Sequence, residues 1–223
     1  MVFSNGKHMI IPVNPELIML AQKNLKFREV VNRASLVLPD GIGVVLASRF
    51  GSHRITERVT GVDTTHRIAE MARRSNLRVF LLGAAPGVAA RAAVKLQEKH
   101  LGLEIAGTYA GSPHPNEEER ICDIVNAAHP HVLLVAYGAP KQELWLARNI
   151  NKLNVPVAMC VGGTFDFIAG TASRAPRAIQ ALGIEWLFRL FQQPSRWKRM
   201  LALPLFAIAV VRRRQTTLNT NNS

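Results

Sequence analysis

Short apolar runs alternate with longer amphipathic segments along most of the chain. The runs that read as strands cover residues 8–13, 34–41, 77–83, 103–111 and 131–138, and another apolar run opens the segment 157–167. The segments between them carry apolar residues at helical spacing, and some open with Pro or with acidic residues, as helices do. Strands that alternate with helices of about 10 to 15 residues predict βαβ units, and hence an α/β fold with a parallel sheet covered on both faces.

The size and composition fit one sizeable globular domain with a short appendage. The chain has 223 residues, of which 48% are hydrophobic and only 6% aromatic, which is typical of an Ala/Val/Leu/Ile core. We expect a globular domain over 1–193, a basic apolar appendage over 194–214 and a disordered polar tail over 215–223. Cys122 and Cys160 lie in apolar stretches without a paired spacing, which favours buried, reduced thiols in a cytoplasmic protein.

Positive charge is concentrated at the C-terminal end. The formal net charge is +13. The 50 residues from Arg174 to the end contain nine Lys/Arg and one acid, Glu185, and so contribute 9 − 1 = +8. Such an excess indicates an anionic partner: a nucleic acid, a phosphorylated substrate or a membrane surface. We expect no nucleic acid partner, because the basic end carries an apolar run instead of spaced, exposed aromatic side chains for stacking.

Small or polar residues follow the strands, where ligands bind in open parallel sheets. Turn chemistry alone explains each such cluster, because tight turns need Gly. The segment GAAPG (83–87) fits the dinucleotide fingerprint poorly, and no P-loop lysine motif is present. We nevertheless take the strand ends as candidate substrate contacts, and together with residues discussed below they are Asn14, Arg58, Gly83, Gly138, Lys141, Gln142, Gly162, Gly163 and Asp166.

Asp40 and Arg58 each allow two interpretations. Asp40 follows an apolar run directly and precedes Gly41, so it either caps the next helix or serves as a general base at the ligand-binding edge. Arg58 lies just before a helix that residues 61–63 begin; it is either a solvated surface arginine or a ligand for phosphate or carboxylate. Asp63 is expected to be the cap of that helix.

Two later segments carry further candidates. The span 161–176 combines Gly162, Gly163 and Asp166 with Arg174, and such glycines permit close approach of a ligand or a tight structural corner. In GIEWLFRL (183–190), Glu185 and Arg189 stand four residues apart, as in a helical ion pair.

Residues 200–211 form an uninterrupted apolar run with arginines on both sides. The run is too short to cross a bilayer, which takes about 20 residues. It fits a segment that lies in an anionic membrane interface, with Trp197 at the level of the headgroups. The alternative is a core helix of a homo-oligomer.

No pattern of metal ligands stands out. His114, His129 and His131 show no ligand spacing, and no Cys/His cluster is present. We expect neither a metal nor a cofactor.

The motifs taken together resemble a known family. NPE, LPDGIGVV, ERVTGVD, VFLLGAAPGV, GTYAG, GAPKQE, VGGTFDFIAGTASRAP, GIEWLFRL and QPSRWKR occur in this order from about Asn14 to Arg199. This order resembles the WecG/TagA/CpsF family of bacterial glycosyltransferases. The resemblance implies a Rossmann-like fold and an inverting transfer of a sugar, of the N-acetylmannosamine type or another hexose, from a UDP-sugar to a membrane-bound, polyprenyl-diphosphate-linked acceptor. It also implies work on cell-wall or exopolysaccharide polymers such as teichoic acid, at the inner face of the cell membrane.

The resemblance also assigns roles to residues. Asp40 matches the catalytic base proposed for the family, and Arg58 and Gln142 match positions implicated in substrate handling. The C-terminal arginines match the appendage thought to meet the lipid diphosphate, and our candidates there are Arg174, Arg189, Arg196 and Arg199.

The segment before NPE departs from the family pattern. Some members have a Thr there that is implicated in activity, whereas IIPVN offers none. The segment also looks shorter than in many members, so we expect a first strand to be missing. The rival hypothesis for the whole chain is a membrane-associated protein that binds a nucleotide sugar without catalysis, for which Asp40 would need no role as a base.

Overall fold

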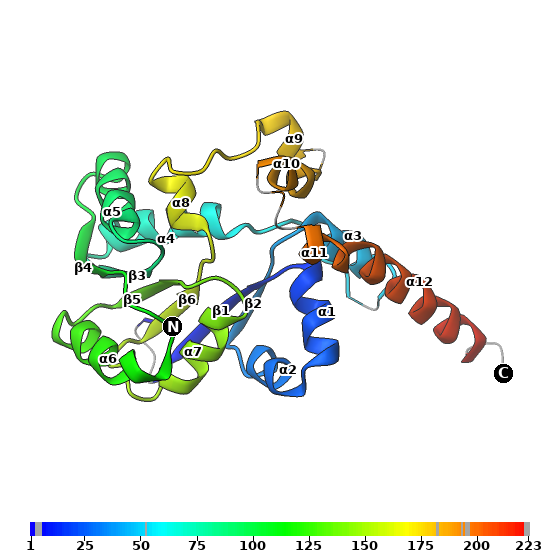
Figure 1. Cartoon of the computed structure of the whole chain (residues 1–223), viewed down its shortest axis with the longest axis horizontal. Helices are drawn as coiled ribbons and strands as arrows, with labels where there is room; N and C mark the ends of the chain where they lie inside the picture. The colour runs from blue at the N-terminus through cyan, green and yellow to red at the C-terminus, as the bar shows by residue number, and fades with distance from the viewer. Residues whose placement is uncertain (3–5, 52, 182, 193, 195–196, 221–223) are drawn as a thin grey trace. The chain divides into compact units, whose positions relative to one another are not determined.

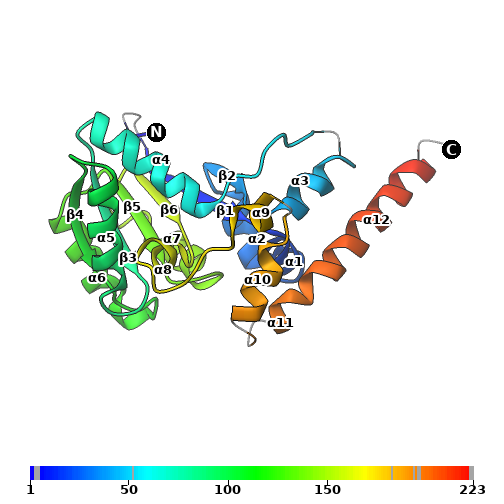
Figure 2. The same cartoon turned by 90° about the horizontal axis from the view of Figure 1, so that it is seen from above.

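The computed structural model describes residues 1–2, 6–51, 53–181, 183–192, 194 and 197–220. The side chains at positions 177, 181, 189, 198 and 213–220 lie outside this description. Figure 1 shows the chain, and Figure 2 shows it from above.

The six strands form one parallel sheet, as the alternating pattern of the sequence predicts. Its strand order is β2-β1-β6-β5-β3-β4. In this parallel register, Met159 of β6 pairs with Ile10 of β1 on one side and with Leu134 of β5 on the other. The strands are β1 (His8–Val13), β2 (Leu36–Pro39), β3 (Arg78–Gly83), β4 (Glu104–Tyr109), β5 (Val132–Ala136) and β6 (Val157–Cys160).

Helices cover both faces of this sheet (Figure 1). On one face lie α4 (Gly61–Arg74), α5 (Val88–Lys99) and α8 (Thr164–Ile168), and a buried cluster joins them to the strands through small residues of α4 and α5 and through Phe165 of α8. On the other lie α6 (Glu118–Ala127), which follows a 3₁₀ turn at Pro115–Glu117, and α7 (Lys141–Asn149). The central strands β5 and β6 are buried along their whole length, which explains their unbroken apolar sequences.

The helix starts follow local capping rules. Asn14 caps α1 (Pro15–Lys23), with its side-chain oxygen accepting from the Leu17 N–H at 3.0 Å, and Pro15 takes the first helical position. The cap of α4 is Thr60 and not Asp63, which corrects the sequence interpretation. Thr60 Oγ1 accepts from the Asp63 N–H at 3.2 Å and donates to the Asp63 carboxylate at 2.7 Å, so Asp63 completes the cap from the first turn of the helix.

The chain divides into two compact units that we describe separately. The sheet unit contains Met1–Pro12, Glu29–Leu38 and Thr60–Ser173. The helical unit contains Val13–Arg28, Pro39–Val59 and Arg174–Ser223. The boundaries therefore fall near the carboxyl ends of β1 and β2, and α2 (Leu25–Asn32) crosses another boundary.

Within the helical unit, the long helix α12 (Ala202–Thr220) packs against α1 and α3 (Ile42–Ser48). Phe206 of α12 is buried, and Pro15 of α1 lies close to Gly43 of α3. Three short helices lead into α12, namely α9 (Arg177–Ala181), α10 (Glu185–Gln192) and α11 (Trp197–Met200). Because α12 runs to Thr220, it includes residues 215–220 of the polar tail.

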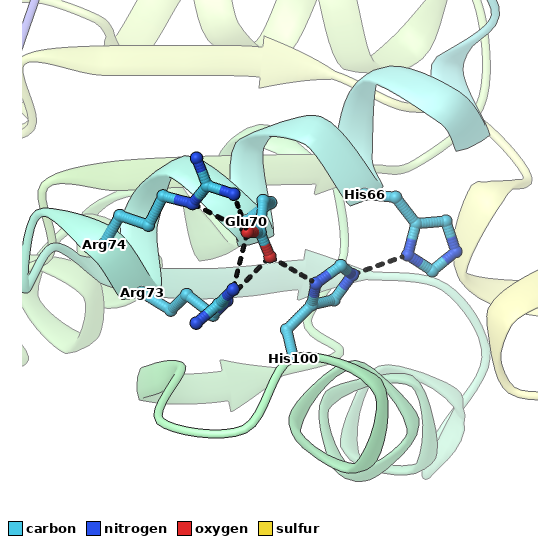
Figure 3. A network of polar contacts seen from close by, with 5 residues as sticks. All are labelled: His66, Glu70, Arg73, Arg74 and His100. Carbon is cyan, nitrogen blue, oxygen red and sulfur yellow. Dashed lines mark hydrogen bonds and ion pairs between the residues drawn. The ribbon is translucent and has the colours of Figure 1, made fainter.

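A polar network connects α4 to the C-terminal end of α5 (Figure 3). Glu70 accepts from Arg73 through both carboxylate oxygens at 2.6 Å and from Arg74 at 2.7 Å, all on α4. His100, the C-cap residue of α5, has its Nδ1 3.3 Å from Glu70 and its Nε2 3.0 Å from His66 Nδ1. The hydrogen bond from Arg73, followed by those from His100 and Arg74, lowers the pKa of Glu70 from about 4.5 to about 2.

The lowered pKa predicts an acid-sensitive contribution of Glu70 to stability. A carboxylate whose pKa is lower in the folded than in the unfolded protein stabilises the fold at pH values above the unfolded pKa. This stabilisation is lost as the pH falls to the folded pKa, which for Glu70 means between about pH 4.5 and pH 2. We expect melting temperatures of the wild type to fall more steeply below pH 5 than those of Glu70→Gln. Glu98→Gln, which removes an exposed carboxylate paired with Lys95 on α5, is the control and should track the wild type. Parallel curves for Glu70→Gln and the wild type would contradict this role.

Candidate active site

The loops that leave the carboxyl ends of β3, β5 and β6 carry the sequence-derived candidates of the sheet unit. Gly83 ends β3 with φ +101°, and a Cβ at this position would lie 2.8 Å from the backbone of Ala136 at the end of β5. Its lack of a side chain is therefore required by backbone packing between neighbouring strands. This packing accounts for Gly83 without a ligand.

Gln142 and Glu143, in the first turn of α7, are buried. The Gln142 side-chain N–H donates to the Glu143 carboxylate at 2.8 Å, and its carbonyl oxygen accepts from the Gly162 N–H at 3.0 Å. Gln142 therefore fastens the loop after β6 to the start of α7. Lys141, at the first position of the same helix, is exposed.

Asp166 and the two glycines before it form the start of α8. Gly162 has φ +57°, and Gly163 is the residue that precedes the helix. The Asp166 carboxylate accepts from Thr171 Oγ1 at 3.3 Å, and its backbone carbonyl accepts from the Thr171 N–H at 2.9 Å. Gly138, with φ +75°, has no atom within 4 Å of the position that a Cβ would occupy, so the turn before α7 leaves open space there.

In the helical unit, two backbone hydrogen bonds place Asp40 between two other candidate segments. The Asp40 N–H donates to the Val13 carbonyl at 2.9 Å, directly before Asn14. The Val59 N–H donates to the Pro39 carbonyl at 3.0 Å, directly after Arg58. The sequence around Asn14, Asp40 and Arg58 is thus gathered where β1 and β2 end.

The start of α3 bears on the capping interpretation of Asp40. The cap of α3 is Gly41, with φ +151°, and a Cβ on Gly41 would come within 3.2 Å of the Pro15 ring. Asp40 therefore precedes the cap position and is not the cap residue of α3. A carboxylate that directly follows a strand, beside a second chain segment, is suited to accept a proton from a bound hydroxyl.

Arg58 and Arg174 share one carboxylate partner. Glu185, the first residue of α10, has one carboxylate oxygen 3.6 Å from the Arg58 guanidinium and the other 3.9 Å from that of Arg174. All three side chains are less than one quarter exposed. The sequence offered Arg189 as the partner of Glu185; the Arg189 side chain lies outside the described part of the chain.

The remaining C-terminal candidates are only partly described. Arg199, in α11, donates to the Glu16 carboxylate of α1 and so connects these two helices. Arg196 lies outside the described residues. The acceptor-binding role expected for these arginines therefore stays a prediction.

The candidate residues are divided between the two units. One residue of the site, Glu185, was missed by the sequence interpretation. The sheet unit holds Gly83, Gly138, Lys141, Gln142, Gly162, Gly163 and Asp166, and the helical unit holds Asn14, Asp40, Arg58, Arg174, Arg189, Arg196 and Arg199. The sequence interpretation missed Glu185 as the common partner of two candidate arginines. A signal was present, because Glu185 is the only acid after Arg174, among nine cationic residues.

The described residues contain neither a metal-ligand cluster nor a membrane-spanning helix. No group of three or more His, Cys, Asp or Glu side chains in the described ranges is placed to hold a metal ion. Within the same ranges, no helix combines the length and the apolar character that crossing a bilayer requires.

Comparison with known proteins gives a consistent result. The family described as "Glycosyl transferase WecG/TagA/CpsF family" matches residues 1–220. A curated protein of Bacillus spizizenii is 33% identical over 208 residues, which cover 93% of this chain and 80% of that protein. One of Bacillus subtilis is 32% identical over 204 residues, covering 92% and 79%. Both are named N-acetylglucosaminyldiphosphoundecaprenol N-acetyl-beta-D-mannosaminyltransferase. With this match over nearly its whole length, the chain belongs to the WecG/TagA/CpsF family of glycosyltransferases.

Proposed function

We propose that the protein is an inverting glycosyltransferase that moves an N-acetylmannosamine-type sugar or another hexose from a UDP-sugar to a polyprenyl-diphosphate-linked sugar acceptor. The observation that carries this proposal is the pair of relatives whose names describe a transfer of N-acetylmannosamine to a polyprenyl-diphosphate-linked N-acetylglucosamine. Each is about one third identical to this protein over more than nine tenths of its length. The polymer made would belong to the cell wall or to an exopolysaccharide.

Asp40 is the residue that we propose as the general base. An inverting transfer needs one group that takes the proton of the acceptor hydroxyl while its oxygen attacks the anomeric carbon, on the side opposite to the departing UDP. Asp40 directly follows β2, is not the cap residue of α3, and is held by a backbone hydrogen bond beside Asn14. These features favour the base over the structural alternative.

The proposed handling of phosphate rests on the charge of the helical unit. This unit contains 15 Lys/Arg and four acids, a net charge of 15 − 4 = +11, whereas the sheet unit has 13 − 11 = +2. Sugar transfer releases a nucleoside diphosphate, and the acceptor carries a diphosphate group of its own. Cations fixed in the protein can stabilise the negative charge of either diphosphate. We propose Arg58, Arg174 and the C-terminal arginines as those cations.

In the sheet unit, we propose that the loop after β6 and the start of α7 form part of the donor site. Gln142 holds the Gly162 N–H and thereby the loop that leads to Asp166. Because its amide is buried between Glu143 and Gly162, we propose that Gln142 shapes this loop rather than acting only by touching the sugar. Lys141, the neighbouring residue, is exposed, and its ammonium group is accessible to an anionic ligand.

Helix α12 supplies the proposed membrane contact. Leu201, just before this helix, and Leu205, Ile208 and Val211 on it are about half exposed and recur at intervals of three or four residues, so they share one face. We name these four residues the outer face of α12. Phe206 is buried instead, and Arg212 lies exposed at the end of the apolar run. An apolar face with flanking cations suits a peripheral attachment to an anionic bilayer, here at the inner face of the cell membrane.

The role of Asp40 predicts a loss of turnover without a loss of donor binding. Asp40→Asn keeps the shape of the side chain and removes the base, so turnover with a UDP-sugar and a lipid-diphosphate-GlcNAc acceptor should fall roughly 10²- to 10⁴-fold. Binding of UDP, measured by calorimetry, should persist. Asp123→Asn, an exposed carboxylate of α6, is the matched control and should keep full turnover. Near-normal turnover of Asp40→Asn would leave the non-catalytic binding protein as the better hypothesis.

The buried position of Gln142 predicts a loss of stability in the free protein. Gln142→Ala leaves the Gly162 N–H and the Glu143 carboxylate without the hydrogen bonds that Gln142 makes, which costs about 1–3 kcal/mol. Urea unfolding should therefore show a lower free energy for this variant in the absence of any ligand. Lys141→Ala, at the exposed position beside it, should unfold like the wild type. A variant with lower activity but unchanged stability would show that Gln142 acts through the substrate alone.

The outer face of α12 predicts binding to anionic vesicles. Replacing Leu205 and Ile208 together by Gln keeps the charge and removes two apolar contacts of about 1.5 kcal/mol each, so partitioning should weaken roughly 100-fold. Co-sedimentation with phosphatidylglycerol-containing and neutral vesicles, at low and high salt, measures this effect. Leu101→Gln, which changes an exposed leucine of the sheet unit, is the control. If the wild type stays in the supernatant throughout, the outer face of α12 is instead to be tested as a subunit contact.

A further inference from the structure

Two histidine rings face each other where α4 meets the C-terminal end of α5 in the sheet unit (Figure 3). His66 Nδ1 lies 3.0 Å from His100 Nε2, and the ring centroids are 5.3 Å apart. The other ring nitrogen of His100, Nδ1, lies 3.3 Å from the Glu70 carboxylate. His100 is buried and His66 is partly buried. We name the two rings the histidine pair.

The number of protons on the histidine pair decides whether its hydrogen bond can form, because the bond needs one donor and one acceptor. In the neutral pair, His100 donates from Nδ1 to the Glu70 carboxylate and accepts at Nε2 from His66. With one added proton, His100 donates from both nitrogens, to Glu70 and to His66. A second added proton leaves an N–H group on each of the two facing nitrogens. The hydrogen bond between the rings is then lost, and two positive charges repel each other.

The charged surroundings of the histidine pair oppose the second proton further. Arg73 and Arg74 both donate to Glu70, so the carboxylate in contact with His100 is already shared by two cations. Lys95 pairs with Glu98. The charged residues of α4, α5 and the elements packed against them further include Asp63 and Arg67 on α4, Arg91 and Lys99 on α5, Asp166 on α8, Arg78 on β3 and Glu104 on β4.

The position of α4 also affects the loop that follows β6. A Cβ on Gly61, the first residue of α4, would lie 3.1 Å from Thr164 Oγ1 and 3.5 Å from the Val161 carbonyl oxygen. Gly162 and Gly163 lie between these two contacts along the chain. Because packed interiors transmit small displacements, a shift of α4 has to move this loop as well.

We propose that the histidine pair is a pH-sensitive link between α4 and the end of α5, which holds with at most one added proton and opens when both rings are protonated. Opening releases α4 from α5 and thereby disturbs the loop after β6. The link takes no part in making or breaking bonds of a substrate. It therefore goes beyond the proposed function and does not depend on which sugar is transferred.

The link should weaken as the pH falls from about 7.5 to about 5.5. An imidazole in an unfolded chain has a pKa of about 6.5, so below this pH the unfolded protein binds a proton on each ring. The folded pair takes up only one proton without losing its hydrogen bond. Stability decreases with falling pH wherever the unfolded state binds more protons. Glu70 stays ionised in this range, because its pKa is about 2.

The first test compares the melting temperatures of the full chain and its variants at these two pH values. His66→Gln replaces the ring by a polar group that does not titrate. We expect the wild type to lose about 2–4 °C more than this variant on acidification, the shift that loss of one hydrogen bond causes in a protein of this size. In a His100→Gln background, His66→Gln should change the pH dependence no further. His53→Gln, an exposed histidine of the helical unit, is the control and should track the wild type.

The comparison uses differences between proteins because another histidine adds a pH dependence of its own. His131 Nδ1 accepts from the Arg78 N–H at 3.0 Å, and protonation of this nitrogen removes the bond. His131 is present in the wild type and in every variant. Its contribution therefore cancels when the pH dependence of a variant is subtracted from that of the wild type.

The second test follows the protons directly by nitrogen-15 nuclear magnetic resonance of the histidine side chains. We expect the rings of His66 and His100 to titrate at pH values more than about one unit apart, because one proton opposes the next. The backbone amide signals of Gly162 and Gly163 should shift on acidification in the wild type and not in His66→Gln.

Several outcomes would overturn the inference. Equal pH dependence of the wild type and His66→Gln would do so, as would two rings that titrate independently at the same pH. A difference that persists in the His100→Gln background would assign the effect to another contact of His66. Amide signals of Gly162 and Gly163 that respond to pH alike in the wild type and in His66→Gln would contradict the coupling to the loop after β6.

Discussion

All strands of the sheet run in the same direction, so every chain segment that follows a strand starts at the same edge. This constraint decides where chemistry can be built, because the opposite edge receives only the ends of helices that return the chain. For this reason Asp40 directly follows β2, Gly83 ends β3, and Gly138 and Gly162 lie two residues after β5 and β6. The buried, hydrogen-bonded β5 and β6 provide the rigid base on which these loops are supported.

Much of the fold was predictable from local pattern. The parallel sheet follows from the alternation of apolar runs with helical segments, and the start of α1 follows from Asn14 and Pro15. The cap of α4 was assigned wrongly because Thr60 and Asp63 both favour helix starts, and only the structure shows which one precedes the helix. The division into two units was not visible, because each unit is assembled from three separate stretches of sequence.

The sequence suggests candidate residues for the site, whereas the contacts of these residues could not be predicted from it. Position after a strand identified Asp40 and Gln142, yet nothing in the sequence shows that Gln142 is buried and bonded to Gly162, twenty residues later. Glu185 was assigned to Arg189 by the four-residue rule for helices, a local rule that cannot reveal Arg58, which is 127 positions away (185 − 58). Contacts over such separations depend on packing of whole segments, which periodicity does not encode.

The uneven charge connects the stability of the helical unit with its ligands. A net charge of +11 on this unit, against +2 on the other, means that its cations repel one another unless anions lie among them. Its four acids cannot balance fifteen cations, and two of them, Glu16 and Glu185, already pair with Arg199 and with Arg58 and Arg174. An anionic ligand or surface that binds only the folded unit would relieve the remaining repulsion and thereby stabilise it. The same charges that make this unit less stable on its own would therefore favour the association with diphosphates and anionic lipid that we propose.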